Sequence, residues 1–167
     1  QMFDTPGDLV IAGGANFNYS ALNDFSAGTA SRFGALRGEG TVTTSYGTHY
    51  IQFGNADKSG EFLGDVTGAL HVTKIGEGTQ TFSGANAYSG TTTVAAGALL
   101  VNGTHTGGGT YTVNGGATLG GSGDLGAGSA WSAVSVQTGG HLAPGANVGS
   151  LGVGTATLPI DSFFDVD

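Results

Sequence analysis

The stretch from Leu70 to Gly103, LHVTKIGEGTQTFSGANAYSGTTTVAAGALLVNG, decides the fold of this chain. It is built from short runs in which polar and apolar residues alternate, with a glycine at nearly every junction. Alternation with a period of two is typical of β-strands that bury one face. The runs follow one another too closely for a helix to lie between them. The stretch therefore predicts a strand that winds around a parallel β-solenoid.

The order and spacing of these residues also resemble the autotransporter-associated β-strand repeat, the passenger-associated transport repeat of bacterial surface and secreted proteins. The resemblance rests on residues that we expect to be structural: Lys74, Gly76, Gly78, Thr79, Phe82, Ser83, Gly84, Asn86, Tyr88, Gly90, Thr92, Val94, Gly97, Leu99 and Val101. It implies a right-handed solenoid and an extracellular structural or passenger segment. It does not imply a catalytic site.

Similar elements outside this stretch extend the repeats over residues 35–158. The run Leu36-Arg37-Gly38-Glu39-Gly40 is echoed at residues 119–123, and Leu142-Ala143-Pro144-Gly145 resembles another element of the same family. We expect an all-β chain with solenoid repeats over residues 33–167. The last of these repeats would be truncated or completed by a neighbouring subunit. Residues 1–32, with Phe17, Tyr19, Leu22 and Phe25, are expected to form an N-terminal cap or an irregular first coil.

The period of such repeats sets the number of turns, here called coils. With about 20–25 residues per coil, the chain would make about seven coils. Corners between strands are expected to hold glycine, or asparagine such as Asn86, because these residues tolerate a positive φ. The interior is expected to be lined by Val, Leu, Ile, Phe and small residues.

Composition excludes several classes of protein. The 167 residues include 34 glycines, three prolines and no cysteine, and 38% are hydrophobic against 10% charged, which argues against disorder and collagen. The net charge is −8 and four basic residues are scattered, so we expect no nucleic-acid partner. No run approaches the ~20 apolar residues of a membrane helix, so no membrane insertion of this segment is expected. Residues 1–6 lack a signal-peptide pattern, and any export signal is expected to be removed or to lie outside this chain.

No catalytic residue, metal site or cofactor is predicted. The carboxylates Asp57, Glu61, Asp65, Glu77 and Asp124 are spread over corners, where solvated charge is the simplest interpretation. The histidines at positions 49, 71, 105 and 141 lack metal-ligand spacing and are expected to be exposed. Residues 120–124, GGSGD, resemble a calcium-binding nonapeptide, but the Asp comes one position early and no second copy follows.

Aromatic residues leave one binding function open. Tyr46, Tyr50, Tyr88, Tyr111 and Trp131 would form a sugar-stacking surface if they shared one outer face. We favour the other interpretation, in which they cover coil ends and stack in ladders.

The last ten residues, LPIDSFFDVD, read as a strand that stops midway. Leu158, Ile160, Phe163, Phe164 and Val166 are the candidate contact with a neighbouring subunit, by strand addition at an uncapped coil. Such contacts would grow an end-to-end homopolymer. The expected function is therefore a secreted or cell-surface, non-enzymatic structural solenoid, as a filament subunit or as a stalk segment of a passenger. The alternatives are an adhesin for cell-surface or matrix polysaccharide and, less favoured, a polysaccharide-cleaving β-helix enzyme.

Overall fold

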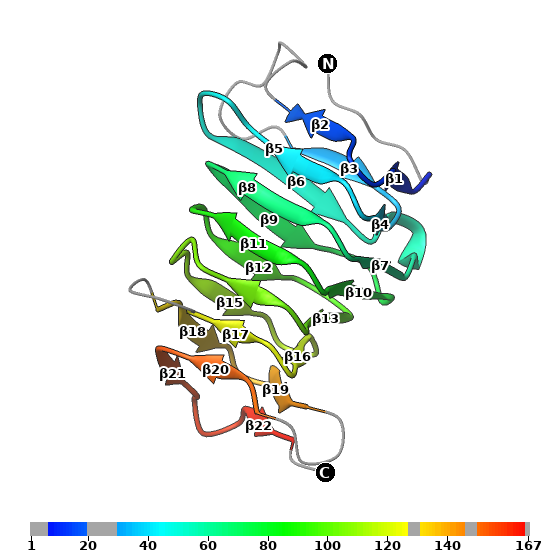
Figure 1. The fold of residues 1–167 in the computed structure, drawn as a ribbon. Coiled ribbons are helices and arrows are strands. Elements are labelled where there is room, and N and C mark those ends of the chain that lie inside the picture. The colour runs from blue at the N-terminus through cyan, green and yellow to red at the C-terminus, as the bar shows by residue number, and fades with distance from the viewer. Residues whose placement is uncertain (1–6, 20–29, 127–130, 146–149, 166–167) are drawn as a thin grey trace.

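The computed structural model describes residues 7–19, 30–126, 131–145 and 150–165. Over these residues the chain forms a right-handed parallel β-solenoid, in which each coil contributes one strand to each of three sheets (Figure 1). The predicted all-β solenoid is confirmed. The strands of the first coil lie at one end of the stack and β20 to β22 (bounds below) at the other.

The three sheets are named here in the order in which the chain first enters them. The first sheet contains β1 (Leu9–Ile11), β4 (Leu36–Gly38), β7 (Gly60–Phe62), β10 (Thr79–Phe82), β13 (Ala98–Val101), β16 (Thr118–Gly121), β19 (His141–Pro144) and β22 (Phe163–Phe164). The second contains β2 (Asn16–Asn18), β5 (Thr41–Thr43), β8 (Asp65–Gly68), β11 (Ala85–Tyr88), β14 (Thr104–His105), β17 (Asp124–Leu125) and β20 (Gly152–Val153). The third contains β3 (Ser31–Phe33), β6 (His49–Phe53), β9 (Leu70–Lys74), β12 (Thr92–Val94), β15 (Tyr111–Val113), β18 (Ala133–Val136) and β21 (Thr155–Thr157).

Coil length varies more than a strict repeat would allow. Thr79 pairs with Ala98, 19 positions on, whereas Leu9 pairs with Leu36, 27 positions on. The short 3₁₀ helix η2 (Asn55–Asp57) adds residues to the corner between β6 and β7. Strands this short are not stable alone, but stacking gives each inner strand a hydrogen-bonded neighbour on both sides.

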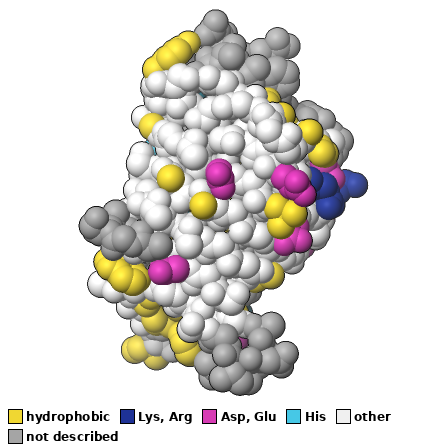
Figure 2. Space-filling model, in the orientation of Figure 1, with side chains coloured by type: hydrophobic (Ala, Val, Ile, Leu, Met, Phe, Trp, Pro, Cys, Tyr) yellow, Lys and Arg dark blue, Asp and Glu magenta, His cyan; other side chains and the backbone are white. Residues whose placement is uncertain are grey.

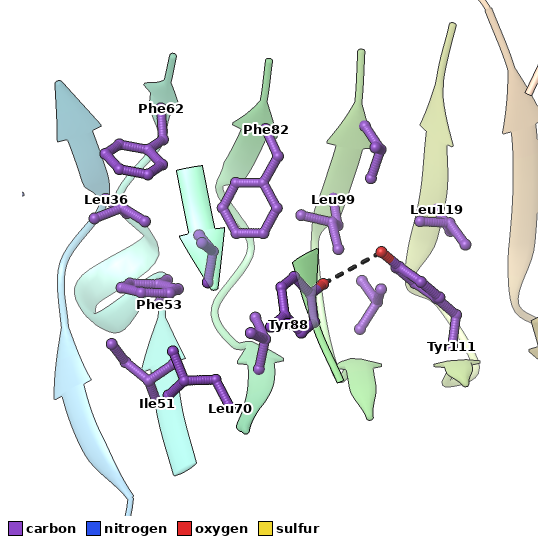
Figure 3. Packing of buried hydrophobic residues seen from close by; sticks show 14 of the residues in the cluster. Leu36, Ile51, Phe53, Phe62, Leu70, Phe82, Tyr88, Leu99, Tyr111 and Leu119 are labelled. Atoms are coloured by element: carbon purple, nitrogen blue, oxygen red, sulfur yellow. Dashed lines mark hydrogen bonds between the residues drawn. The ribbon is translucent and has the colours of Figure 1, made fainter. Parts of the chain in front are cut away.

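The core consists of ladders of inward side chains that repeat from coil to coil. In the first sheet Gln80, Leu99, Leu119 and Leu142 pair in direct register. Phe62 and Phe82 form a second ladder beside them, and the aromatic rings fill the space between the sheets (Figure 3). The alternation seen in the sequence thus places every second residue in an apolar interior.

Glycine columns allow the coils to stack at the corners. A Cβ on Gly84 would lie 2.0 Å from the carbonyl oxygen of Gly64, and one on Gly103 would lie 2.1 Å from that of Gly84. No side chain fits at such distances, so close approach of the backbones requires glycine here. The expected corner role of Asn86 is wrong: it lies inside β11 with 1% of its surface exposed. Among the described non-glycine residues, a left-handed φ occurs at Ala56 and Asp57.

The described part of residues 1–32 forms the first coil of the stack. Strands β1, β2 and β3 pair with β4, β5 and β6. Leu22 and Phe25, which the sequence assigned to a cap, lie outside the described residues. The domain boundary at residue 33 stays a prediction. In the described part of the chain, no helix has the length and apolarity needed to cross a membrane.

Candidate functional site

The motif residues of the central stretch fill one complete coil and the first strand of the next. They run from Lys74, at the end of β9, through β10, β11 and β12 to Val101, at the end of β13. Because Lys74 pairs with Val94, the next coil begins at the end of β12. The polar motif residues point inward together with the apolar ones. Four groups of polar contacts in and beside the complete coil define the candidate site, and each one reaches a backbone group or side chain of another coil.

Lys74 is buried at a corner, with only 1% of its surface exposed. Its Nζ donates hydrogen bonds to the carbonyl oxygens of Ile75 (2.7 Å) and Gly76 (2.7 Å) and to that of Ala96 (3.2 Å), on the next coil. Burial lowers the pKa of Lys74 to about 8, although nearby Glu77 and Asp57 act to raise it. The ammonium therefore joins the corners of two successive coils at a cost in desolvation.

Gln80 bridges three strands of the first sheet. Its Nε2 donates to the carbonyl oxygen of Leu36 and its Oε1 accepts from the Leu36 N–H, both at 2.9 Å. Gly60 of the intervening β7 pairs with Gln80 and has no side chain to block the way. The Gln80 amide thus bonds the backbone groups of Leu36, which β7 leaves unpaired because the β4–β7 ladder contains only the Gly38–Phe62 pair. Gln80 was not among the residues predicted from the sequence; its signal was an amide on the same strand face as Phe82.

Asn86 makes a similar contact with the preceding coil in the second sheet. Its Oδ1 accepts from the N–H of Val66 on β8 (3.0 Å), and its Nδ2 donates to the carbonyl oxygen of Gly84 (3.3 Å). Because the side chain is buried, these bonds replace water that the amide would otherwise hold.

A buried hydrogen-bonded network joins four side chains, those of Tyr88, Thr92, Tyr111 and His105. His105 Nε2 lies 2.8 Å from the Tyr88 carbonyl oxygen, which only accepts, so Nε2 carries the proton and Nδ1 accepts from the Tyr111 hydroxyl at 2.9 Å. The Tyr88 hydroxyl lies 3.2 Å from that of Tyr111 (Figure 3). It also lies 2.7 Å from the hydroxyl of Thr92.

Burial shifts the pKa of every ionisable side chain in this network. It is the main cause that lowers the pKa of His105 and raises the pKa values of Tyr88 and Tyr111, so all three are neutral at pH 7. The expectation of an exposed histidine is wrong for His105, which is fully buried and stacks on the Tyr88 ring at 4.2 Å. A neutral, fully paired network of this kind stabilises one arrangement of the core.

Comparison with protein-family models identifies this same coil. Residues 72–101 match the model described as Passenger-associated-transport-repeat. The chain carries a passenger-associated transport repeat. The matched segment begins in β9 and ends with β13, so it includes Lys74, Gln80 and Asn86 and their coil-to-coil bonds. Searches of curated proteins and of solved structures found no match.

The five aromatic residues do not share one outer face, so the alternative of a sugar-stacking surface does not form from them. Tyr88 and Tyr111 are in the core. Tyr50 stacks face to face on His71, with centroids 4.7 Å apart and an interplanar angle of 11°. Tyr46 and Trp131 remain as exposed rings.

The carboxylates around the repeat hold successive corners together. Asp57 Oδ1 accepts from the N–H of Glu77 (2.7 Å), and Asp65 Oδ1 accepts from that of Ala85 (2.9 Å). Glu61 accepts a hydrogen bond from the Ser83 hydroxyl at 2.7 Å. Among the described residues, no three His, Cys, Asp or Glu side chains gather as metal ligands would.

The C-terminal coil carries the residues proposed as a subunit contact. Phe164 pairs with Leu142 and so continues the core ladder of the first sheet, yet it is 54% exposed. Phe163 lies on the outer side, where its ring stacks on His141 at 4.5 Å. Leu158 and Ile160 are exposed between β21 and β22, and Val166 lies outside the described residues. Their role in a contact stays a prediction.

Proposed function

We propose that the chain is a non-enzymatic structural segment of an exported or surface-displayed bacterial protein. The observation that carries this proposal is the direction of the repeat's polar side chains. Lys74, Gln80 and Asn86 are the kinds of residue that bind ligands elsewhere, but here their donors and acceptors bond backbone groups of the solenoid itself. These hydrogen bonds hold neighbouring coils together, as the function of a stalk requires.

Substitution of these residues tests the structural role. In Asn86→Leu and Gln80→Leu, buried backbone groups lose their partners, and each change should lower the free energy of unfolding by about 1–3 kcal/mol or more. The matched control is Gln137→Leu, which alters an exposed side chain. Unchanged stability in the two buried variants would contradict the proposal.

The second part of the proposal is that a further coil stacks on the C-terminal coil of the solenoid. The core ladder reaches the surface at Phe164, and a further coil stacked on β22 would bury this ring and pair with the strand edge. We propose that such a coil covers the C-terminal coil, either from an adjoining part of a longer passenger or from a neighbouring subunit of a filament. The passenger version has the support of the matched repeat.

Assembly measurements separate these two versions. If subunits stack end to end, the purified chain should form filaments visible by electron microscopy, and Phe164→Asp should abolish them. Leu63→Asp, at an exposed residue that follows β7 in the middle of the stack, should leave them intact. Discrete monomers at all concentrations, measured by light scattering, would refute the filament version and leave the stalk version.

A further inference from the structure

The sequence contains two Asn-Gly pairs, and both follow a valine at the end of a strand. Val101-Asn102-Gly103 leads from β13 to β14, and Val113-Asn114-Gly115 leads from β15 to β16 (Figure 1). Asparagine before glycine is prone to spontaneous deamidation, because glycine has no Cβ to shield its backbone nitrogen. The same local sequence thus lies at two different corners of the solenoid, and the surroundings of each corner determine whether the reaction can occur.

The corner at Asn114 exposes the groups that would react. Residues 114–117 form a tight turn, closed by a hydrogen bond from the Ala117 N–H to the Asn114 carbonyl oxygen (2.9–3.0 Å range of such turns), with a φ of 79° at Gly116. Within the described residues, neither the Asn114 side chain nor the Gly115 N–H makes a hydrogen bond. Gly115 and Gly116 are exposed, so water reaches this peptide bond. Two adjacent glycines also give the turn more backbone freedom than other residues would.

The corner at Asn102 holds the same groups in place. The Gly103 N–H donates a hydrogen bond to the carbonyl oxygen of Phe82 (3.1 Å), and Asn102 Oδ1 accepts one from the N–H of Ser122 (3.2 Å) on the next coil. Gly103 is also half-buried in a glycine column, where its backbone lies against that of Gly84. Attack by the Gly103 nitrogen would therefore require this corner to open locally.

We propose that Asn114 is a site of spontaneous deamidation and that the fold protects Asn102 from the same reaction. The Gly115 nitrogen, after it has lost its proton to hydroxide or buffer, attacks Cγ of the Asn114 side chain. A new N–C bond forms, and the side-chain nitrogen leaves as ammonia. Water then hydrolyses either C–N bond of the resulting succinimide, which gives aspartate or isoaspartate. The net reaction replaces an amide by a carboxylate and consumes water. This inference does not rest on the proposed structural function.

The modification would alter a surface that is already acidic. The net charge of the chain is −8, and acidic side chains are scattered over the face seen in Figure 2. An added carboxylate changes the charge from −8 to −9, and isoaspartate also places an extra methylene in the backbone. The corner is bonded to both neighbouring coils, because the Asn114 N–H donates to the Val94 carbonyl oxygen and the Gly116 N–H to that of Gly139. Isoaspartate should therefore weaken the stacking of coils at this corner.

Incubation of the folded chain at pH 8 and 37 °C in water enriched in oxygen-18 tests the proposal. Peptide mass spectrometry then measures the labelled carboxylate formed at each asparagine. We expect the product at Asn114 to form at least about ten times faster than that at Asn102, which corresponds to about 1.4 kcal/mol in activation free energy. In urea the fold no longer distinguishes the two Val-Asn-Gly segments, so the two rates should become similar.

Two matched variants link the acidic product to its site. Asn114→Gln should remove the acidic species that anion-exchange chromatography resolves, because glutamine cyclises far more slowly, and Asn102→Gln should leave that species in place. Circular dichroism checks that both variants fold. Equal rates at the two asparagines of the folded chain, or a folded chain that gains no oxygen-18 at Asn114, would overturn the proposal. So would a rate at Asn102 that does not rise in urea, since the fold would then give this residue no protection.

Discussion

The buried ammonium of Lys74 should give this chain an unusual pH dependence, which Lys74→Met removes. The pKa of Lys74 is about 8 in the folded chain and 10.5 when the side chain is free in water. Between these values the unfolded chain binds more protons than the folded one. Stability therefore rises as pH increases through this window, and it is lost as pH falls toward 8.

The size of the effect follows from the two pKa values. One unit of pKa difference corresponds to about 1.4 kcal/mol, and integration over pH 7 to pH 9 gives a gain of about 1.3 kcal/mol in the free energy of unfolding. The buried tyrosines act in the opposite direction at higher pH. Burial raises the pKa values of Tyr19, Tyr88 and Tyr111, so their contribution begins to be lost near pH 10, where a tyrosine of the unfolded chain is half ionised. The measurement should therefore stop at pH 9.

Urea denaturation followed by circular dichroism at pH 7, 8 and 9 measures the effect. The wild-type free energy of unfolding should rise over this series, and that of Lys74→Met should stay level. Lys58→Met is the control, because Lys58 is exposed and its removal should leave the rise intact. A level wild-type profile, or the same rise in Lys74→Met, would refute the argument that Lys74 is buried in its charged form.

Three other substitutions test the remaining contacts. Because burial lowers the pKa of His105, its contribution to stability should fade as pH falls below 6.5, and His105→Gln should reduce the drop in melting temperature between pH 7.5 and pH 5. Gln80→Leu leaves the N–H and carbonyl of Leu36 without partners and should cost about 1–3 kcal/mol or more in urea denaturation. Gly84→Ala should cost about 3 kcal/mol or more, since its Cβ would overlap a carbonyl oxygen, whereas Gly13→Ala, whose Cβ would meet only the Glu39 side chain at 3.3–3.7 Å, should change stability by about 0.5 kcal/mol or less.

The solenoid itself could be predicted from local sequence. Alternating residues between glycines specify which side chains face the core, and the spacing of these runs leaves room only for short connections. The columns that include Gly84 and Gly103 carry most of this information, because each glycine marks a corner where coils touch. The matched repeat has the same origin, since its order of residues is the order of one coil.

The polar interior could not be predicted in the same way. Gln80 bonds a residue 44 positions away, and this contact depends on the missing side chain of Gly60 in between. His105 lies in a two-residue strand, too short for its alternation to show that it points inward. Such contacts depend on which residues three-dimensional stacking brings opposite each other. Coil lengths that vary from 19 to 28 residues hide that alignment in the sequence.

The buried polar groups address a problem that apolar ladders leave open. Leu99 pairs with Leu119 and Leu119 with Leu142, so a shift of one coil relative to another would exchange similar apolar contacts at small cost. Asn86 and Gln80 behave differently, because each one bonds the backbone of a single defined residue. A shift would leave these amides and their partners buried without hydrogen bonds, at about 1–3 kcal/mol for each group. We infer that the polar residues of the repeat select one register among many similar ones, as buried polar groups do in coiled coils.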